Sequence, residues 1–194
     1  MNTTPTLMRE VNAFNLSAAS ENKIHDDKVA QKFGFKGGLV PGVEVYAYMS
    51  NLPVQQFGAE WLSSGTAECR FLQPVYDGHP AVASGFLERD GSLVMKVESG
   101  GVLCGSGTAS PNHNTPLANI ENYATTTLPD FGLRPDAKPE SLVEGQIMGT
   151  FVQEMNADEL TQYLVDVRED IEFYTTNEVV HPGWLLRLGN RALS

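Results

Sequence analysis

The pattern of apolar and polar positions begins with a strand and then gives a buried helix. A loose alternation of apolar residues over Met8–Ala18 predicts a first β-strand. The stretch from Pro41 to about Pro53 is apolar nearly all round. That pattern is typical of a helix covered on every side, and we expect Asn51 and Pro53 to end it.

A second, shorter helix is expected between these two elements. It passes through Ala30 and Phe33, with Asp26 or Asp27 as its N-cap, and ends at Gly34. The stretch Gln55–Ser64 after the long helix is expected to be a connection.

A run of four strands is predicted in the middle of the chain. Short Asp-Gly and Gly-Gly pairs separate these apolar stretches, and such pairs favour tight turns between antiparallel strands. One buried helix followed by consecutive hairpins indicates an α+β fold. The expected strands are Gly65–Val75, Ala81–Glu88, Ser92–Ser99 and Val102–Ser110.

The last third of the chain has a different character. The segment 111–140 is polar and spaced by prolines, so it is interpreted as a linker. The segment 141–194 is predicted to hold a strand at Ser141–Glu154 and a helix at Ala157–Val167, with Asn156 or Asp158 as the helix N-cap.

Composition narrows the possible functions. The net charge of −11 and the pI of about 4.7 argue against binding to nucleic acid, which needs clustered Lys and Arg. Two cysteines predict no disulfide framework, and the four histidines show no metal-ligand spacing, so neither a metal nor a cofactor is expected. The N-terminus lacks the pattern of a signal peptide, and no apolar run is long enough for a membrane span. A cytoplasmic protein is the expectation.

One polar loop and one glycine at a helix start carry the candidate chemistry. Asn22 and His25 lie on the polar loop, and Gly42 opens the apolar helix. A histidine can transfer a proton near neutral pH. The free N–H groups at a helix start can stabilise a developing oxyanion.

Three segments resemble the MaoC-like family, which contains the (R)-specific enoyl-CoA hydratases. Ser20-Glu21-Asn22-Lys23-Ile24-His25 is similar to the family loop Asp-x-Asn-Pro-Ile/Leu-His, and Leu39-Val40-Pro41-Gly42 is similar to its helix start. Phe71–Gly78 is similar to its Phe-x-x-Pro-Val-x-x-Gly segment. The resemblance covers about Val11–Ser110. It implies a hotdog fold, an antiparallel sheet wrapped around a central helix, over residues 1–110.

The resemblance also implies roles for individual residues. The expected reaction adds or removes water at the 2,3 position of an acyl thioester carried by CoA or by a carrier protein. His25 is then the general base, Asn22 orients His25 or the water, and Gly42 binds the thioester oxygen next to Val40 and Pro41. Ser20 stands where the family has a catalytic Asp, so one proton-transfer role is vacant. Glu21 or Asp26 could fill it, although neither occupies the family position.

A weak internal repeat points to a partial second module. Val179-Val180-His181-Pro182-Gly183 echoes Leu39–Gly42, and both apolar stretches that follow end near an Asn, Asn51 and Asn190. Residues 141–194 are therefore interpreted as a partial second hotdog-like segment, with Tyr174 where the first copy has His25. Alternatively, the chain is a fragment of a longer one.

Two alternatives to a hydratase stay open. The first is a non-catalytic hotdog subunit that binds a thioester or completes a dimer, in which His25 only braces the loop. The second is a hotdog thioesterase, for which Glu44 is the nearby carboxylate. In every case we expect a homodimer, because an isolated sheet leaves an edge strand exposed, and residues 141–194 are expected to pack on the first module or on its partner.

Overall fold

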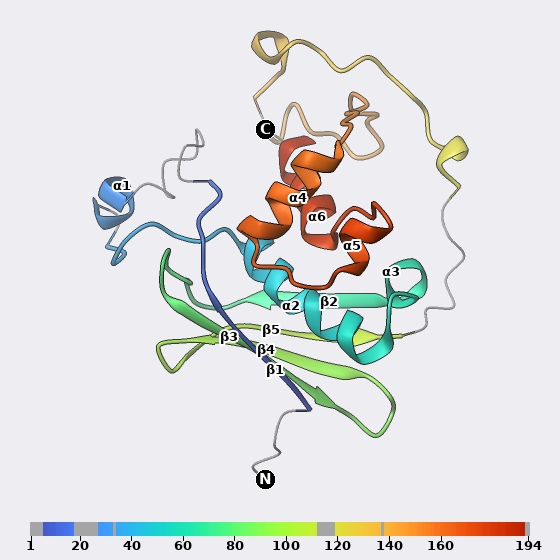
Figure 1. Ribbon diagram of the computed structural model, residues 1–194. Coiled ribbons are helices and arrows are strands. Elements are labelled where there is room, and N and C mark those ends of the chain that lie inside the picture. Colours follow the sequence, from blue (N-terminus) through green and yellow to red (C-terminus); the bar gives the residue numbers. More distant parts are fainter. Residues whose placement is uncertain (1–5, 18–26, 33, 112–118, 137, 193–194) are drawn as a thin grey trace.

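A five-stranded antiparallel sheet forms the base of the computed structural model (Figure 1). The structure describes residues 6–17, 27–32, 34–111, 119–136 and 138–192. The strands follow the order β1-β3-β4-β5-β2, so β1 and β2 lie at the two edges. Their bounds are β1 Leu7–Asn12, β2 Thr66–Phe71, β3 Pro80–Leu87, β4 Leu93–Ser99 and β5 Val102–Ser110. The predicted α+β hotdog arrangement is confirmed.

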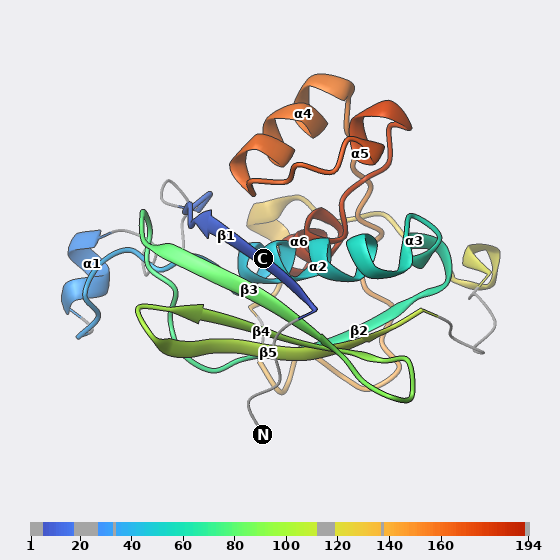
Figure 2. The ribbon, with the colours of Figure 1, turned by 60° about the horizontal axis from the view of Figure 1, so that its bottom comes forward.

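The long helix α2, Gly42–Phe57, lies across one face of this sheet (Figure 2). Strand residues alternate between the two faces, so every second side chain points at α2. On β4 these are Leu93, Met95 and Val97, all fully buried. Tyr48, Met49 and Leu52 of α2 are buried against them in the same apolar core. The nearly continuous apolar pattern of the helix follows from its position between the sheet and a further layer.

Gly107 of β5 lies where the sheet is packed too closely for a side chain. A Cβ atom there would collide with the backbone carbonyl of Glu68 on β2, and it would lie 2.8 Å from the sulfur of Cys69 and 3.2 Å from Cε of Met49 on α2. A Cβ atom at Gly105 would make ordinary contacts with Met49 and Val45, at 3.6 and 3.7 Å. A side chain is therefore excluded at Gly107 by β2 more than by the helix.

The helix continues past its predicted end. Pro53 lies inside α2, which ends at Gly58, where a φ of 80° allows the N–H to bond to the Val54 carbonyl. Leu52, Pro53 and Val54 are all buried, so packing outweighs the local cost of a proline in a helix. The prediction that Asn51 and Pro53 end the helix is wrong.

The connection after α2 also differs from the prediction. It contains a short helix, α3 (Trp61–Ser64), whose Trp61 is buried and donates from its indole nitrogen to the Ser110 carbonyl at 3.1 Å. The first strand ends at Asn12, because the N–H of Ala13 bonds to the His79 carbonyl as the chain leaves the sheet. The short helix α1, Asp27–Lys32, forms where it was predicted, and Gly34 follows it with a φ of 88°.

Three C-terminal helices form the additional layer on α2 (Figures 1 and 2). They are α4 (Ala157–Asp166), α5 (Phe173–Thr176) and α6 (Pro182–Ala192). Asn156 caps α4 through a capping box with Glu159, as one of the two predicted caps. Tyr163, Val167 and Trp184 belong to the same apolar core as α2. The C-terminal segment therefore packs on the first module within one chain, as expected.

The strand expected at Ser141–Glu154 does not form in the part of the chain that the structure describes. Residues 119–155 run over the surface with two short 3-10 helices, η2 (Ile120–Asn122) and η3 (Phe131–Leu133). Val143, Ile147 and Val152 are all mostly exposed. A strand needs a neighbour for its backbone groups, and this segment pairs with neither edge strand of the sheet.

Candidate functional site

The candidate site is built at the start of α2. The residues before α2 are positioned by a short antiparallel contact with another segment. Val40 N–H donates to the Val75 carbonyl at 2.9 Å, and Leu39 pairs with Tyr76. Pro41 is the N-cap and supplies no side-chain cap. The N–H groups of Gly42 and Val43 have no acceptor among the described residues, since the first turn of a helix lacks intrahelical partners. These groups can receive an anionic oxygen.

An apolar pocket of about 230 Å³ opens at this helix start. Val40 and Gly42, two of the three predicted substrate-binding residues, line it, and Pro41 lies between them in the chain. The other lining residues come from the two segments that pair before the helix, from α2 and from β5. They are Phe35, Leu39, Val45, Phe71, Leu72, Gln73, Pro74, Val75 and Cys104.

Phe71 lies directly over Gly42. A Cβ atom built on Gly42 would be 2.9 Å from two carbons of the Phe71 ring, closer than real Cβ contacts come. Glycine at this position therefore has a physical reason beyond its backbone freedom, because a larger residue would force the Phe71 ring to move. The predicted functional reason, access to the Gly42 N–H, is compatible with this packing.

The three predicted catalytic residues, Ser20, Asn22 and His25, lie outside the described residues. The chain that enters their loop is fixed at several points. Phe14 N–H donates to the Tyr48 hydroxyl of α2 at 3.0 Å, and Asn15 N–H donates to Asp77 Oδ1 at 2.9 Å. Asn15 therefore lies beside the segment that pairs with Leu39.

A buried polar network, which the sequence did not reveal, joins the C-terminal layer to α2. Glu169 lies at its centre and is almost fully buried. Asn51 Nδ2 donates to Glu169 Oε1 at 2.7 Å, and Arg9 Nη1 lies 4.0 Å from Glu169 Oε2. The available signal was the presence of Glu44, Ser50 and Asn51 in an otherwise apolar helix. A buried polar residue is usually hydrogen-bonded, so each one predicts a partner.

His181 belongs to this network and is fully buried. Gly183 N–H donates to His181 Nδ1 at 3.0 Å, so Nδ1 carries no proton. The proton is therefore on Nε2, which lies 3.2 Å from Glu169 Oε2 and donates to it. Burial lowers the pKa of His181 and outweighs the raising effect of the Glu169 carboxylate. His181 is a neutral structural residue at the start of α6.

Glu44 forms a second buried contact between the layers. It lies in the first turn of α2, is fully buried, and has Oε1 3.6 Å from Nη1 of Arg187 on α6. Neither carboxyl oxygen has a hydrogen-bond partner among the described residues. Burial raises the pKa of Glu44 to about 7, although the Arg187 charge acts in the opposite direction. Glu44 points toward α6 and does not line the apolar pocket.

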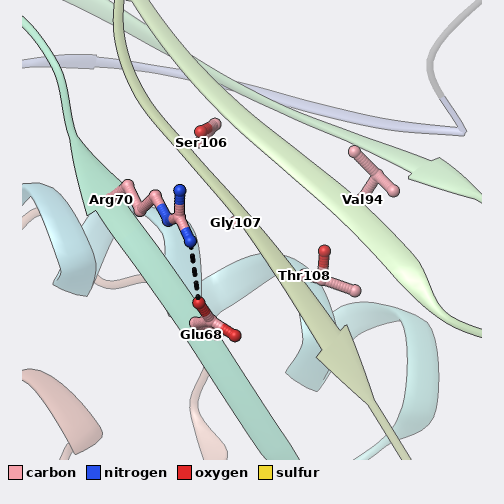
Figure 3. A pocket seen from close by; sticks show the side chains of 6 residues that line it. All are labelled: Glu68, Arg70, Val94, Ser106, Gly107 and Thr108. Carbon is pink, nitrogen blue, oxygen red and sulfur yellow. Dashed lines mark ion pairs between the residues drawn. The ribbon is translucent and has the colours of Figure 1, made fainter.

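Among the described residues, two other hollows lack a helix start with N–H groups beside an apolar wall. A polar hollow of about 210 Å³ lies behind the paired segments and is lined by Gln31, Lys36, Gly37, Gly38, Tyr76, Asp77 and His79. The hollow in Figure 3 lies on the face of the sheet opposite α2, where Glu68 and Arg70 form an exposed ion pair at 3.7 Å. Exposed ion pairs of this kind contribute little to binding or stability.

The described residues contain no cluster of His, Cys, Asp or Glu suited to a metal ion. None of the described helices is both long enough and apolar enough to span a bilayer. Cys69 is half-buried and Cys104 is buried, and both are free thiols. Burial raises the pKa of the Cys69 thiol to about 11, which disfavours its use as a nucleophile.

Comparison with solved structures identifies the fold. The chain superposes on a MaoC-like dehydratase from Phytophthora capsici with a TM-score of 0.51 and 18% identity, covering 59% of this chain and 42% of that one. This chain has a hotdog fold. The (R)-hydratase from A. caviae involved in PHA biosynthesis matches with a TM-score of 0.42 and 20% identity over 56% of this chain and 97% of that chain. An R-hydratase from Pseudomonas aeruginosa matches with a TM-score of 0.41 and 16% identity over 61% and 93%.

The sequence comparisons gave no relatives: no family model and no curated protein matches this hotdog chain. The structural matches, all at or below 20% identity, show the fold alone. The chain aligns with less than half of the Phytophthora protein. The fold alone does not determine the function, which depends on the residues of the site.

Proposed function

We propose that the chain is an enoyl-thioester hydratase or dehydratase whose reaction centre lies at the start of α2. The observation that carries the proposal is the pair of N–H groups at Gly42 and Val43, which have no acceptor in the described part of the chain and lie next to an apolar pocket of about 230 Å³. A thioester with its oxygen at these groups would have its acyl chain beside Val40 and Val45. Oriented N–H donors at such an oxygen stabilise the enolate of the transition state.

His25 supplies the base in this proposal. In the hydration direction it takes a proton from water, and the water oxygen bonds to the β-carbon of the enoyl group. The electrons of the double bond move to the thioester oxygen, and the resulting enolate then receives at its α-carbon the proton that His25 took from the water, which returns His25 to its neutral form. Asn22 orients His25 or the water, and the Ser20 hydroxyl holds the water in place of the family carboxylate.

A non-catalytic role is the second candidate, favoured by Ser20. A serine hydroxyl cannot act as the carboxylic acid of the family mechanism, and a missing acid or base is typically worth about 10²–10⁴-fold in rate. If no other group fills that role, the site binds a thioester without turning it over. The thioesterase alternative needs a carboxylate at the thioester, and Glu44 is buried against Arg187 on another side of α2.

A panel of trans-2-enoyl-CoA thioesters separates these functions. Hydration removes the conjugated double bond and its absorbance, whereas hydrolysis releases a CoA thiol that a thiol reagent detects. We expect loss of absorbance with no thiol release. Binding without either change would support the non-catalytic role, and thiol release would support the thioesterase role.

We also infer that a second copy pairs along β2 to give a homodimer. β2 is an edge strand of only six residues, and the face of α2 away from the sheet is already covered by α6, with Tyr163 of α4 in the same core. The unpaired backbone groups of an edge favour pairing with another strand.

Residues 111–140 act in this arrangement as a linker, and residues 141–194 as a partial second hotdog-like segment in which α6 covers the central helix.

A further inference from the structure

The ring of Phe71 lies between the sheet and the start of α2, at the wall of the apolar pocket. Phe71 is the last residue of β2, and its side chain is on the same face of the strand as Ala67 and Cys69, toward α2. Its cross-strand neighbour on β5 is Gly105, which has no side chain to support it. The ring instead lies on Gly42 and forms one wall of the apolar pocket.

The ring is held less firmly than its position suggests. Phe71 is 48% exposed and is not part of the buried core. Beyond it the chain leaves the sheet, with Leu72 N–H donating to the Cys104 carbonyl at 2.8 Å. Half-exposed side chains change rotamer rapidly. The ring can therefore turn away from Gly42 without disturbing the packing between α2 and the sheet.

We propose that Phe71 determines the length of the acyl chain that this site accepts. The inference rests on the proposed function, because it assumes that a thioester oxygen binds at Gly42. With the ring in place the pocket measures about 230 Å³, below the roughly 300–1,000 Å³ of pockets for drug-sized ligands. That space corresponds to on the order of seven water-sized groups, enough for a thioester group and a short acyl chain.

A longer acyl chain would need the volume that the ring fills. Its methylenes would take over the contact that the ring makes with Gly42 and would lie against the apolar wall that Val40, Val45 and Val75 give the pocket. Replacing Phe71 with alanine opens this volume permanently. Each buried methylene adds to affinity, so two further methylenes raise it by about tenfold.

The test measures the affinity of saturated acyl-CoA analogues in which a methylene replaces the thioester sulfur. These ketone analogues keep the carbonyl oxygen, and neither hydration nor hydrolysis occurs. Butyl, hexyl, octyl and decyl chains are titrated calorimetrically into the wild-type protein, Phe71→Ala and Phe71→Leu. We expect wild-type affinity to fall at the longer chains, Phe71→Ala to gain about tenfold for octyl and decyl, and Phe71→Leu to lie between. The variant Phe86→Ala serves as the matched control, because Phe86 lies under Lys96 on the opposite face of the sheet.

The outcomes separate the two proposals. If the ketone analogues bind and Phe71→Ala keeps the wild-type length preference, or if Phe86→Ala changes it equally, Phe71 does not set the length. If the longer chains gain affinity in Phe71→Ala and not in Phe86→Ala, the role of the ring is supported. If none of the four proteins binds any ketone analogue, the proposed function fails, and the role of Phe71 fails with it.

Discussion

The neutral imidazole of His181 donates from Nε2 to Oε2 of Glu169 at 3.2 Å, in the buried layer between α2 and the C-terminal helices. Asn51 of α2 donates to the other oxygen of the same carboxylate. Asn51 and Glu169, which meet in this bond, lie 118 positions apart in the chain. This contact fixes the C-terminal layer on the helix whose first turn forms the candidate site.

Replacing His181 with alanine should destabilise the protein by about 3–5 kcal/mol, because it removes a donor from a buried carboxylate and leaves a cavity. Urea unfolding followed by far-ultraviolet circular dichroism measures the change. The exposed His79 provides the control, and His79→Ala should change stability by about 0.5 kcal/mol or less. Equal effects of the two substitutions would show that the His181–Glu169 contact contributes nothing.

The same histidine predicts a dependence of stability on pH. Its pKa in the folded protein is below the ordinary value of 6.5, so the folded state binds fewer protons than the unfolded state. The contribution of His181 to the free energy of unfolding is complete above pH 6.5. It is lost as the pH falls from 6.5 through the lowered pKa of the folded protein. The free energy of unfolding of His181→Gln should therefore fall less than that of the wild type when the pH falls below 6.5.

Glu44 predicts a pH effect of opposite sign. Its pKa rises from 4.5 to about 7 on folding, so the folded state binds the extra proton. The contribution of Glu44 to the free energy of unfolding is complete below pH 4.5. It is lost as the pH rises through about 7, and the total loss is about 3 kcal/mol. Glu44→Gln should remove this loss, which unfolding at pH 5.5 and pH 8 measures. An unchanged difference between the two pH values in the variant would contradict the assignment.

Two glycines of α6 offer a matched test of how closely this helix packs. A Cβ atom at Gly183 would lie 2.7 Å from the Cβ of Ala47 and 2.6 Å from the Tyr163 hydroxyl, whereas one at Gly189 would meet nothing within 4 Å. Gly183→Ala should destabilise by about 1–3 kcal/mol through overpacking. Gly189→Ala should be neutral or stabilise by up to about 1 kcal/mol through helix propensity. Thermal unfolding of both variants makes the comparison, and equal effects would show that α6 does not pack on α2 at Ala47.

The proposed homodimer predicts twice the chain mass of 21.1 kDa. Light scattering on a size-exclusion column measures it directly at several protein concentrations. A mass of one chain throughout would show that the edge of β2 stays unpaired.

How much the sequence predicts depends on whether a pattern is local. The strands after Gly65 could be placed because alternation and the Asp90-Gly91 turn are local signals, and β5 matches its predicted bounds. The helix end predicted at Pro53 is wrong because the free-energy cost of a proline inside a helix is offset by its burial among residues far away in the chain. The apolar pattern of Ser141–Glu154 resembles a strand, but nothing in that pattern shows whether the sheet has a free place for it.

The same distinction applies to the site. Gly42 was predicted as the start of the helix because Leu39–Gly42 is a contiguous motif, and α2 does begin there. The contact of Phe71 with Gly42 and the network around Glu169 depend on which distant residues meet, and spacing along the chain does not contain that information. The roles of Ser20, Asn22 and His25 stay predictions.

The measurement that tests the central claim most directly is the hydration rate of a short trans-2-enoyl-CoA by the wild type, His25→Ala and His79→Ala. We predict that the wild type and His79→Ala remove the conjugated double bond at similar rates, and that His25→Ala is slower by about 10²–10⁴-fold. Hydration by His25→Ala at the wild-type rate, or no turnover by the wild type of a thioester that it binds, would contradict the assignment of His25 as the base of a hydratase.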